Sequence, residues 1–244
     1  TILAMLQARI GRFDAGPRRA VLAASVFGQT FWQGGAARVL GFREQAAEVD
    51  TWLQALVESE LIEAHESSQI PQQREYAFRH ALVRDAAYGL LTENDQKLGH
   101  ACAAEFLETA DRQISPAILA YHYRQAGLLD KALQSYLKAG DGANQQALYE
   151  EARVHYAAAI EVITQLEQTA ALRRLHADLL VKRVQNGMTS LSAESQISFL
   201  EQARSLLGTL SDPQDADRED RLRLARVDFY QGRMFNYTGQ PVKA

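Results

Sequence analysis

The chain has 244 residues, of which 47% are hydrophobic and 23% charged, and its formal net charge is -4. This length is enough for one large or two ordinary domains, and the charge excludes a global attraction to nucleic acid or anionic membranes. No apolar run reaches the roughly 18 residues of a membrane span, and the single cysteine, Cys102, excludes an internal disulfide, so the chain is predicted to be cytoplasmic.

The first part of the chain is predicted to be mostly helical. Apolar residues at helical spacing predict helices over 2–13, 17–28, 33–40 and 44–59. Two short β-like runs follow over 61–64 and 75–78, joined by a polar loop. Three helices followed by a β-hairpin are the order of a winged-helix module, which we place at residues 1–92.

A winged helix raises the possibility of DNA binding, and the charges argue against it. Residues 44–73 contain seven Asp and Glu residues and no Lys or Arg. The helix before the wing would enter the groove, where a duplex-binding surface needs cations that face phosphates. Protein packing is the favoured use of this module, and nucleic acid is an unlikely partner.

The stretch 76–91, YAFRHALVRDAAYGLL, joins the wing to the rest of the chain. Its first residues alternate as in a strand, and a helical pattern follows over 81–91, so His80 is placed where a strand meets a helix. Thr92 is predicted to cap the next helix, with Asp95 at its third position. This connecting helix, at 93–114, is expected to place Leu98, Cys102, Phe106 and Leu107 on one apolar side.

Residues 115–244 are predicted to form a truncated array of tetratricopeptide-like repeats. Ser115 and Pro116 start a helix. The spacing of the residues that follow fits the repeat pattern, in which small residues allow close helix approach and aromatic residues fill the gap. The second-helix pattern recurs after twenty residues, so the helix at 130–147 is expected to serve two pairs. The matching positions are Leu119, Ala120, Tyr123, Gly127, Ala132, Tyr136, Ala139, Ala152, Tyr156 and Ala159.

Further helices are predicted over 172–187 and 193–207, and residues 211–220 are predicted to be a disordered polar loop. Gly232, Phe235, Gly239 and Ala244 continue the repeat spacing, so we expect the chain to be a fragment that cuts a longer array. The arginines of this part are expected on solvated helix faces: Arg173, Arg174, Arg221, Arg223 and Arg226.

The chain shows no complete active site, so it is predicted not to be an enzyme and to hold no cofactor or metal by itself. It has no Gly-rich phosphate loop followed by Lys and Ser or Thr, and its six histidines lack zinc-ligand spacing. Cys102 is expected to be a small core residue and His100 to be structural. Tyr123, Tyr136 and Tyr156, with His122 and His155 beside two of them, are expected to pack within the repeats or to line their groove.

The order of modules and three stretches resemble the signal-transduction ATPases with numerous domains. The stretches are LQARIGRFDAGPRRAVLAASVFGQTFW (6–32), YAFRHALVRDAAYGLL (76–91) and AYHYRQAGLLDKALQSYLKAGDGA (120–143). The resemblance is to the bacterial branch, in which a P-loop ATPase precedes a winged helix and tetratricopeptide-like repeats. It implies ATP or ADP in the full-length protein and often a fused adenylate or guanylate cyclase, protein kinase or LuxR-type regulator.

The resemblance also implies a role for His80. In related immune receptors a Met-His-Asp motif of the winged helix places its histidine on the diphosphate of ADP and holds the off state. His80 matches that histidine, whereas Arg79 replaces the Met and Ala81 replaces the Asp. The alternative is that His80 ends the wing by hydrogen-bonding a nearby carbonyl.

The expected fold is therefore mainly α, a winged helix with a small β-hairpin followed by an α-α superhelix. The leading hypothesis is a non-catalytic regulatory fragment. Its winged helix packs on an ATPase domain of the same protein, and its repeats sense a protein or small ligand. The alternatives are a stand-alone tetratricopeptide scaffold for protein–protein interaction and a DNA-binding transcriptional regulator.

Overall fold

A computed structural model describes residues 2–42, 47–110, 114–208 and 218–238. The described residues are mainly helical and include a small three-stranded sheet. The chain divides into two compact units, Thr1–Leu128 (unit 1) and Leu129–Ala244 (unit 2), and each is described by itself. The domain limits expected from the sequence, near residues 92 and 114, stay a prediction.

The first four helices of the chain, the later helix α5 (Ala81–Tyr88) and the sheet enclose the first core of unit 1. Apolar side chains of these helices pack with the strands in one cluster, and complete burial of a large side chain contributes roughly 1.5–3 kcal/mol. Of the region predicted to be helical over 44–59, the described residues form a helix over Ala47–Glu58. Residues 43–46 lie outside the described part. The first four helices are α1 (Ile2–Gly11), α2 (Ala15–Ser25), α3 (Gln33–Val39) and α4 (Ala47–Glu58).

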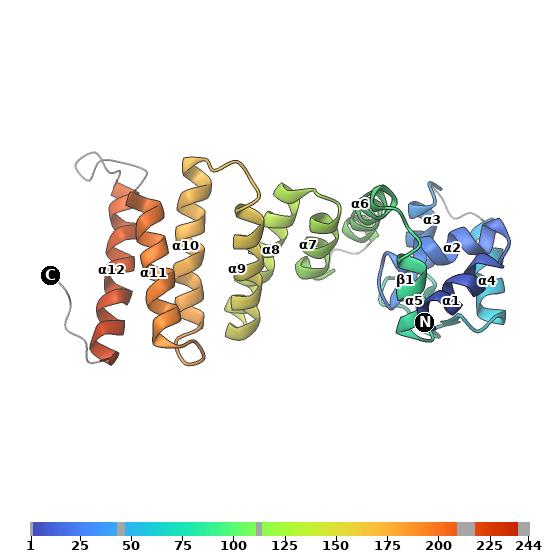
Figure 1. The fold of residues 1–244 in the computed structure, drawn as a ribbon, viewed down its shortest axis with the longest axis horizontal. Helices are drawn as coiled ribbons and strands as arrows, with labels where there is room; N and C mark the ends of the chain where they lie inside the picture. Colours follow the sequence, from blue (N-terminus) through green and yellow to red (C-terminus); the bar gives the residue numbers. More distant parts are fainter. Residues whose placement is uncertain (1, 43–46, 111–113, 209–217, 239–244) are drawn as a thin grey trace. The chain divides into compact units, whose positions relative to one another are not determined.

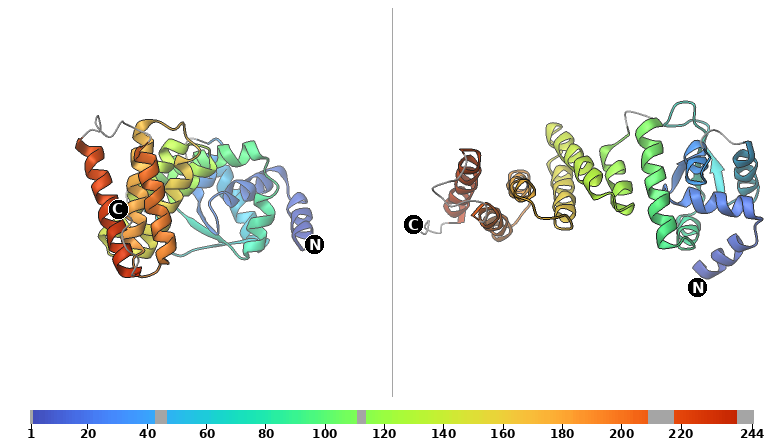
Figure 2. Two further views of the ribbon diagram at one scale, coloured as in Figure 1. Left: turned by 60° about the vertical axis from the view of Figure 1, so that its left-hand side comes forward. Right: turned by 90° about the horizontal axis from the view of Figure 1, so that it is seen from above.

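The sheet has the order β1-β3-β2, with both pairs antiparallel. The two predicted strands are confirmed as β2 (Ile62–Ala64) and β3 (Glu75–Phe78), while β1 (Thr30–Trp32) was not expected. The central strand β3 is buried along its whole length, since it pairs on both sides and packs on the helices. Figure 2 shows the strands beside the helices of unit 1.

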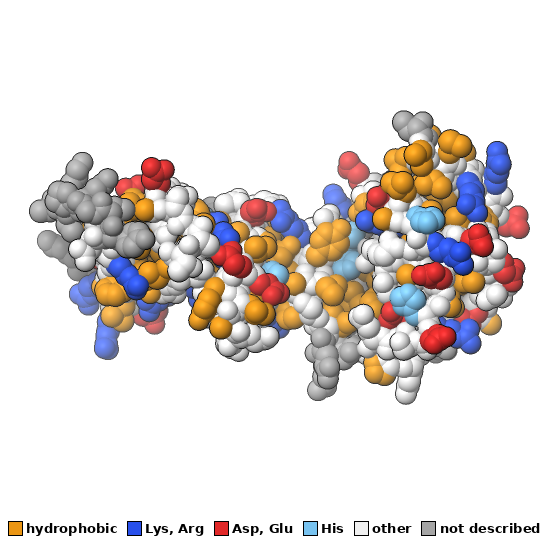
Figure 3. Space-filling view, turned by 90° about the horizontal axis from the view of Figure 1, so that it is seen from below, with side chains coloured by type: hydrophobic (Ala, Val, Ile, Leu, Met, Phe, Trp, Pro, Cys, Tyr) orange, Lys and Arg blue, Asp and Glu red, His pale blue; other side chains and the backbone are white. Residues whose placement is uncertain are grey.

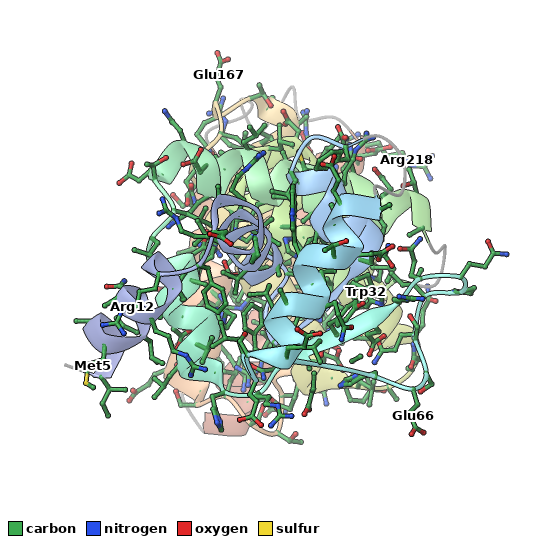
Figure 4. The ribbon with its side chains drawn as sticks, turned by 90° about the vertical axis from the view of Figure 1, so that its right-hand side faces the viewer. Met5, Arg12, Trp32, Glu66, Glu167 and Arg218 are labelled. Carbon is green, nitrogen blue, oxygen red and sulfur yellow. The ribbon has the colours of Figure 1, made fainter. Side chains whose placement is uncertain are left out.

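A buried carboxylate fixes the loop between β2 and β3. Glu75 accepts hydrogen bonds from Trp32 Nε1 (3.0 Å) and the Gln69 amide (2.8 Å), and its other oxygen lies 2.9 Å from His65 Nδ1. Burial alone would raise the pKa of Glu75, but these hydrogen bonds outweigh it and lower the pKa. Trp32 and Glu66, at the base and tip of this region, are labelled in Figure 4.

Three further helices complete unit 1: α5 (Ala81–Tyr88), α6 (Glu93–Ala110) and α7 (Pro116–Gln125). The two predicted caps are confirmed. The Asp95 amide donates to Thr92 Oγ1 (3.2 Å), and the Ala117 amide donates to Ser115 Oγ (3.3 Å). Residues 111–113 of the predicted connecting helix lie outside the described residues.

The predicted apolar faces of α5 and α6 were partly wrong. Helix α5 ends at Tyr88 rather than at residue 91, and Leu82 and Leu90 are 49% and 42% exposed. Leu98 is 65% exposed, because the buried side of α6 consists of small residues, one histidine and one leucine. These residues are Gly99, His100, Ala103, Ala104 and Leu107.

Unit 2 is a succession of helices in which each packs on the next. Figure 1 shows α9 to α12 side by side. The predicted small residues Ala152 and Ala159 and the aromatic Tyr156 between them are fully buried. The helices expected to form the first repeat pair, α7 and α8, belong to different units. The helices are α8 (Leu129–Gln145), α9 (Tyr149–Ile163), α10 (Ala170–Asn186), α11 (Ala193–Gly208) and α12 (Arg218–Thr238).

Two expectations about unit 2 were wrong in part, although Arg221 and Arg226 are exposed as expected. Residues 218–220 of the predicted disordered loop begin α12, whereas 211–217, 239 and 244 lie outside the described residues. Asp220 is 3% exposed and accepts two parallel hydrogen bonds from Arg174, at 2.8 and 2.7 Å. Arg223 binds Asp220 (3.2 Å) and Asp178 (3.1 Å), so these arginines join helices instead of facing only solvent.

The same turn ends α7 and α8, with different residues at its key position. Gly127 has φ +75° and Ala147 has φ +59°, and in each case the next amide donates to a carbonyl five residues back, at 2.9 Å. The left-handed conformation is easy for glycine and strained for alanine. The positive φ of this turn therefore explains why a glycine suits position 127, as predicted.

Candidate functional site

His80 lies at the junction that the sequence indicated. It follows β3 and precedes α5, with extended backbone angles (φ −137°, ψ 132°), and its carbonyl accepts the Val83 amide at 2.9 Å. Its side chain is exposed and forms no hydrogen bond with the residues that the structure describes. The imidazole is therefore directed to solvent in unit 1, and no described carbonyl binds it.

The neighbouring Arg79 faces acidic side chains. Its guanidinium lies 3.8 Å from Glu60 and 3.9 Å from Glu63, and its amide donates to the Leu61 carbonyl at 3.1 Å. All three charged side chains are largely exposed, so these ion pairs contribute little to stability. Arg79 thus makes polar contacts directly after β3.

The three tyrosines predicted for the repeat groove or packing are all buried. Tyr123 and Tyr136 are 2% and 8% exposed, and Tyr156 is fully buried. The Tyr123 hydroxyl donates to Glu108 at 2.6 Å. Burial first and then the hydrogen bond to the carboxylate raise the pKa of Tyr123. Their burial supports the packing alternative, since little of these rings is open to a partner.

Tyr156 belongs to a polar cluster within unit 2. Its hydroxyl donates to Asp141 Oδ1 at 2.7 Å, and Lys182 Nζ donates to the same oxygen at 2.6 Å. The Lys182 ammonium also lies 5.0 Å from the centre of the Tyr156 ring, a cation–π distance. One carboxylate thus joins α8, α9 and α10 through hydrogen bonds and an ion pair.

A second polar cluster, which the sequence did not indicate, lies inside unit 1. His100 on α6 is fully buried and His122 on α7 is 2% exposed, and their Nδ1 atoms are 2.9 Å apart. The Tyr88 hydroxyl at the end of α5 lies 2.9 Å from His100 Nε2. We name this Tyr88–His100–His122 chain the histidine relay. Its rings also contact Tyr121 and Phe27 edge-on or tilted.

The surroundings keep the histidine relay uncharged. Burial lowers the pKa of His100 to about 4. Burial and then the neighbouring His100 lower the pKa of His122 to about 3. Burial and the nearby Tyr121 raise the pKa of Tyr88, while Arg84 acts in the opposite direction. At neutral pH each ring therefore carries one proton, and the hydroxyl keeps its own.

This chemistry restricts what the histidine relay does. Only one of the two Nδ1 atoms can carry the shared proton, so the chain of hydrogen bonds runs either from Tyr88 to His122 or in reverse. In the described part of the chain, neither histidine side chain hydrogen-bonds a serine, cysteine or carboxylate. The relay holds α5, α6 and α7 together by directional bonds.

Few sequence signals could have revealed the histidine relay. His100 and His122 are 22 residues apart and lie on different helices. The expectation that His100 is structural agrees with its burial. Cys102, expected in the core, is half-buried. Burial and the nearby Glu105 raise the pKa of its thiol, while Arg38 acts in the opposite direction. A raised thiol pKa disfavours the reactive thiolate.

The described residues contain no group of three or more His, Cys, Asp or Glu side chains placed to hold a metal ion. Within the same residues, no helix is both long and apolar enough to cross a bilayer.

Comparisons with models of protein families, with curated proteins and with solved structures found no match to this chain.

Proposed function

We propose that this chain is a regulatory, non-catalytic part of a signalling ATPase. In this proposal, unit 1 contains a winged helix that packs on a nucleotide-binding domain outside these residues. The helices that follow form tetratricopeptide-like repeats and receive a protein or small ligand. Ligand binding shifts the protein from a closed, ADP-held state toward an open one.

The order and contacts of the elements support this proposal. Helices α2 to α4 precede the β2–β3 hairpin, and the helices and the sheet share one core. In unit 2, buried small residues flank the buried Tyr156 at the spacing of a repeat. Both features are those that the resemblance to signal-transduction ATPases predicts.

The observation that carries the proposal is the exposed side chain of His80. An imidazole at a strand-to-helix junction, without a hydrogen bond to the described residues, is available to a phosphate of a nucleotide held elsewhere. The first amides of α5 are beside it. The chain itself has no phosphate loop, so ATP or ADP is bound by the other domain and only contacted from here.

The test uses the full-length protein that the proposal requires. His80→Ala removes the contact with ADP and is expected to raise basal output, because the closed state loses a stabilising interaction. Lys97→Ala, at an exposed position of α6 in unit 1, is the control and is expected to leave basal output unchanged. An unchanged basal output of His80→Ala would rule out the switch role, and ATP turnover by the purified chain would contradict the non-catalytic assignment.

A scaffold that binds a partner through its repeats is the second candidate. Its supporting observation is a set of large apolar side chains on the surface of unit 2, among them Tyr149, Val154 and Phe229, which are 53%, 60% and 63% exposed. In that case a partner would bind chains with and without the His80→Ala change equally. Dependence of partner binding on His80 would favour the regulatory proposal.

A further inference from the structure

A cavity of about 680 Å³ opens in unit 2 between the start of α11 and the last turns of α12. Its lining combines three large apolar side chains, Met188, Leu191 and Met234, with polar side chains that include Gln196 and Arg233. Its volume is within the range of about 300–1,000 Å³ that is usual for small-ligand sites. A small molecule with both apolar and polar groups fits such a lining.

Gln196, a residue of the cavity lining, has one side-chain acceptor that no described residue uses. The residue is 3% exposed, and its Nε2 donates to the Leu191 carbonyl at 2.9 Å. That bond fixes the orientation of the amide, because a flipped amide would oppose two oxygens. The Oε1 atom is buried and has no hydrogen-bond partner among the residues that the structure describes. A buried acceptor without a partner destabilises the fold, and a bound N–H donor removes that cost.

Arg233 gives the cavity its charge. Its side chain is exposed on α12 and forms no ion pair with any residue that the structure describes. The lining contains no Asp or Glu, so nothing in it neutralises the guanidinium. Guanidinium groups bind carboxylates through two parallel hydrogen bonds. An anionic group is thus favoured at this side of the cavity.

The apolar part of the cavity is held in place by a close contact. A Cβ added at Gly187 would lie 2.3 Å from Leu191 Cδ1, so Leu191 folds closely against the end of α10. Met234 is 4% exposed and belongs to the core of unit 2, against which Met188 packs. Flexible thioethers adapt to branched aliphatic groups, which favours an apolar side chain on the ligand.

We propose that this cavity binds an N-acylated apolar amino acid, such as an acylated leucine. Its carboxylate pairs with Arg233, its amide N–H donates to Gln196 Oε1, and its side chain packs on Met188, Leu191 and Met234. The inference rests on the proposed function in that it names the ligand class for the sensing role of the repeats. Binding itself is measured on this chain alone.

Methyl spectra provide a direct test with an internal control. The chain has three methionines, and a sample labelled with [methyl-¹³C]methionine gives one signal for each. Two of them line the cavity, whereas Met5 is 74% exposed on α1 in unit 1. Figure 4 shows Met5 at the tip of that helix. Addition of N-acetyl-L-leucine is expected to shift the Met188 and Met234 signals and to leave the Met5 signal in place.

Two analogues separate the polar contacts. N-acetyl-leucinamide lacks the carboxylate, and N-acetyl-N-methyl-leucine lacks the N–H donor. Each is expected to bind about tenfold more weakly, since a hydrogen bond to a charged or buried group contributes about 1.5 kcal/mol. Equal shifts with all three probes would show apolar adherence only and would overturn the proposal, as would shifts of Met5 equal to those of the other two.

Variants assign the contacts to residues. Arg233→Gln is expected to weaken N-acetyl-L-leucine about tenfold and to abolish its preference over the amide. Arg226→Gln, two turns earlier on α12 and exposed, is the matched control and should change neither. Gln196→Met is expected to remove the discrimination against the N-methyl analogue; if that variant does not fold, the N-methyl analogue on the unchanged chain still decides the point.

Two further outcomes separate this proposal from others. A ten-residue peptide ending in leucine that binds far more tightly than N-acetyl-L-leucine would assign the cavity to a protein C-terminus and overturn the small-ligand class. Specific shifts of Met188 and Met234 together with an inactive His80 switch would support the ligand site while the regulatory role fails. If millimolar N-acetyl-L-leucine shifted neither methionine signal, the ligand site would be overturned. That result would not affect the His80 test.

Discussion

At the scale of single residues, the histidine relay has the most restrictive chemistry. Two neutral rings share one proton between Nδ1 atoms 2.9 Å apart, and Tyr88 is bonded to the far nitrogen of His100. Whichever ring donates through Nδ1, the other must carry its proton on Nε2. The two histidines are thus constrained to opposite tautomers in either direction of the hydrogen-bond chain.

This constraint is measurable by two-bond ¹H–¹⁵N correlation spectra of the imidazole rings. We expect one of His100 and His122 to be protonated on Nδ1 and the other on Nε2 at neutral pH. The replacement Tyr88→Phe is expected to favour one direction of the chain and so to change the proportions of the two arrangements. The same tautomer in both rings would contradict the relay.

The histidine relay also predicts how the stability of unit 1 depends on pH. In the unfolded chain a histidine titrates near pH 6.5, whereas the pKa values here are lowered to about 4 and about 3. Below pH 6.5 the unfolded state binds more protons, so the free energy of unfolding falls as the pH drops from about 6.5 toward 4. Each histidine contributes a slope of at most about 1.4 kcal/mol per pH unit.

Urea unfolding at a series of pH values checks this slope. The triple variant Tyr88→Phe/His100→Leu/His122→Leu is expected to flatten it, because both histidines of unit 1 whose pKa is lowered by burial are then replaced. His155→Gln, in unit 2, is the control and should keep it. A triple variant with the slope of the unchanged chain would show that other groups cause the pH dependence.

At the scale of elements, α8 contains two glycines that the sequence alone treats alike. Both lower helix propensity, yet the structure distinguishes them. A Cβ at Gly140 would lie 2.5 Å from the buried Tyr156 ring, while a Cβ at Gly142 meets nothing within 4 Å. Gly140 is thus required by the close approach of α9, and Gly142 is not.

The two glycine-to-alanine replacements are therefore expected to act in opposite directions. Gly142→Ala should raise the free energy of unfolding by about 1 kcal/mol, since alanine is the better helix former. Gly140→Ala should lower it by about 1–3 kcal/mol, because the ring must move. Urea unfolding followed by circular dichroism measures both, and a change of the same sign in both variants would refute this packing.

The N-terminal turn of α12 depends on Asp220. We expect Asp220→Ala to lower the free energy of unfolding of unit 2 by about 2 kcal/mol, since Arg174 and Arg223 lose a charged hydrogen-bond acceptor. Asp228→Ala breaks the exposed pair with Arg204 on the same helix and should cost less than about 1 kcal/mol. Hydrogen exchange of the α12 amides compares them, and equal protection loss in both would contradict the prediction.

At the scale of the whole molecule, the charges argue against binding to duplex DNA. On the face shown in Figure 3, acidic and basic side chains are interspersed with hydrophobic ones. Helix α4 carries acidic residues in its first turn and no basic residue in its last. We expect no retardation of duplex DNA in a gel shift even at low salt. The variant Glu48→Lys/Glu58→Lys/Glu63→Lys shows whether the assay detects added positive charge; salt-dependent retardation of the unchanged chain would contradict the expectation.

The sequence predicted local features better than contacts between distant segments. Periodicity located most helices and the strands over 61–64 and 75–78, and cap residues located the start of α6 and α7. Strand β1 was missed because three residues give too little alternation to detect. Leu98 was placed in the core because periodicity indicates which residues share a face, and not which face a neighbouring helix covers.

The candidate sites followed the same division. The position of His80 between a strand and a helix could be read from consecutive residues. The partners of His100 and Arg174 are 22 and 46 residues distant, and no local spacing connects them. The buried Oε1 of Gln196 could not be predicted as an unused acceptor either. It is unused because the Leu191 carbonyl binds the Nε2 atom of the same amide, and a sequence does not show that contact.

The bond from Trp32 to Glu75 has a practical consequence for spectroscopy. The chain has two tryptophans, Trp32 and Trp52, and both lie in unit 1. Tryptophan emission therefore reports the unfolding of unit 1 alone, and the indole held against a carboxylate is its sensitive fluorophore. Unit 2 contributes only tyrosine emission. A difference between the fluorescence and circular dichroism midpoints would measure how independently the two units unfold.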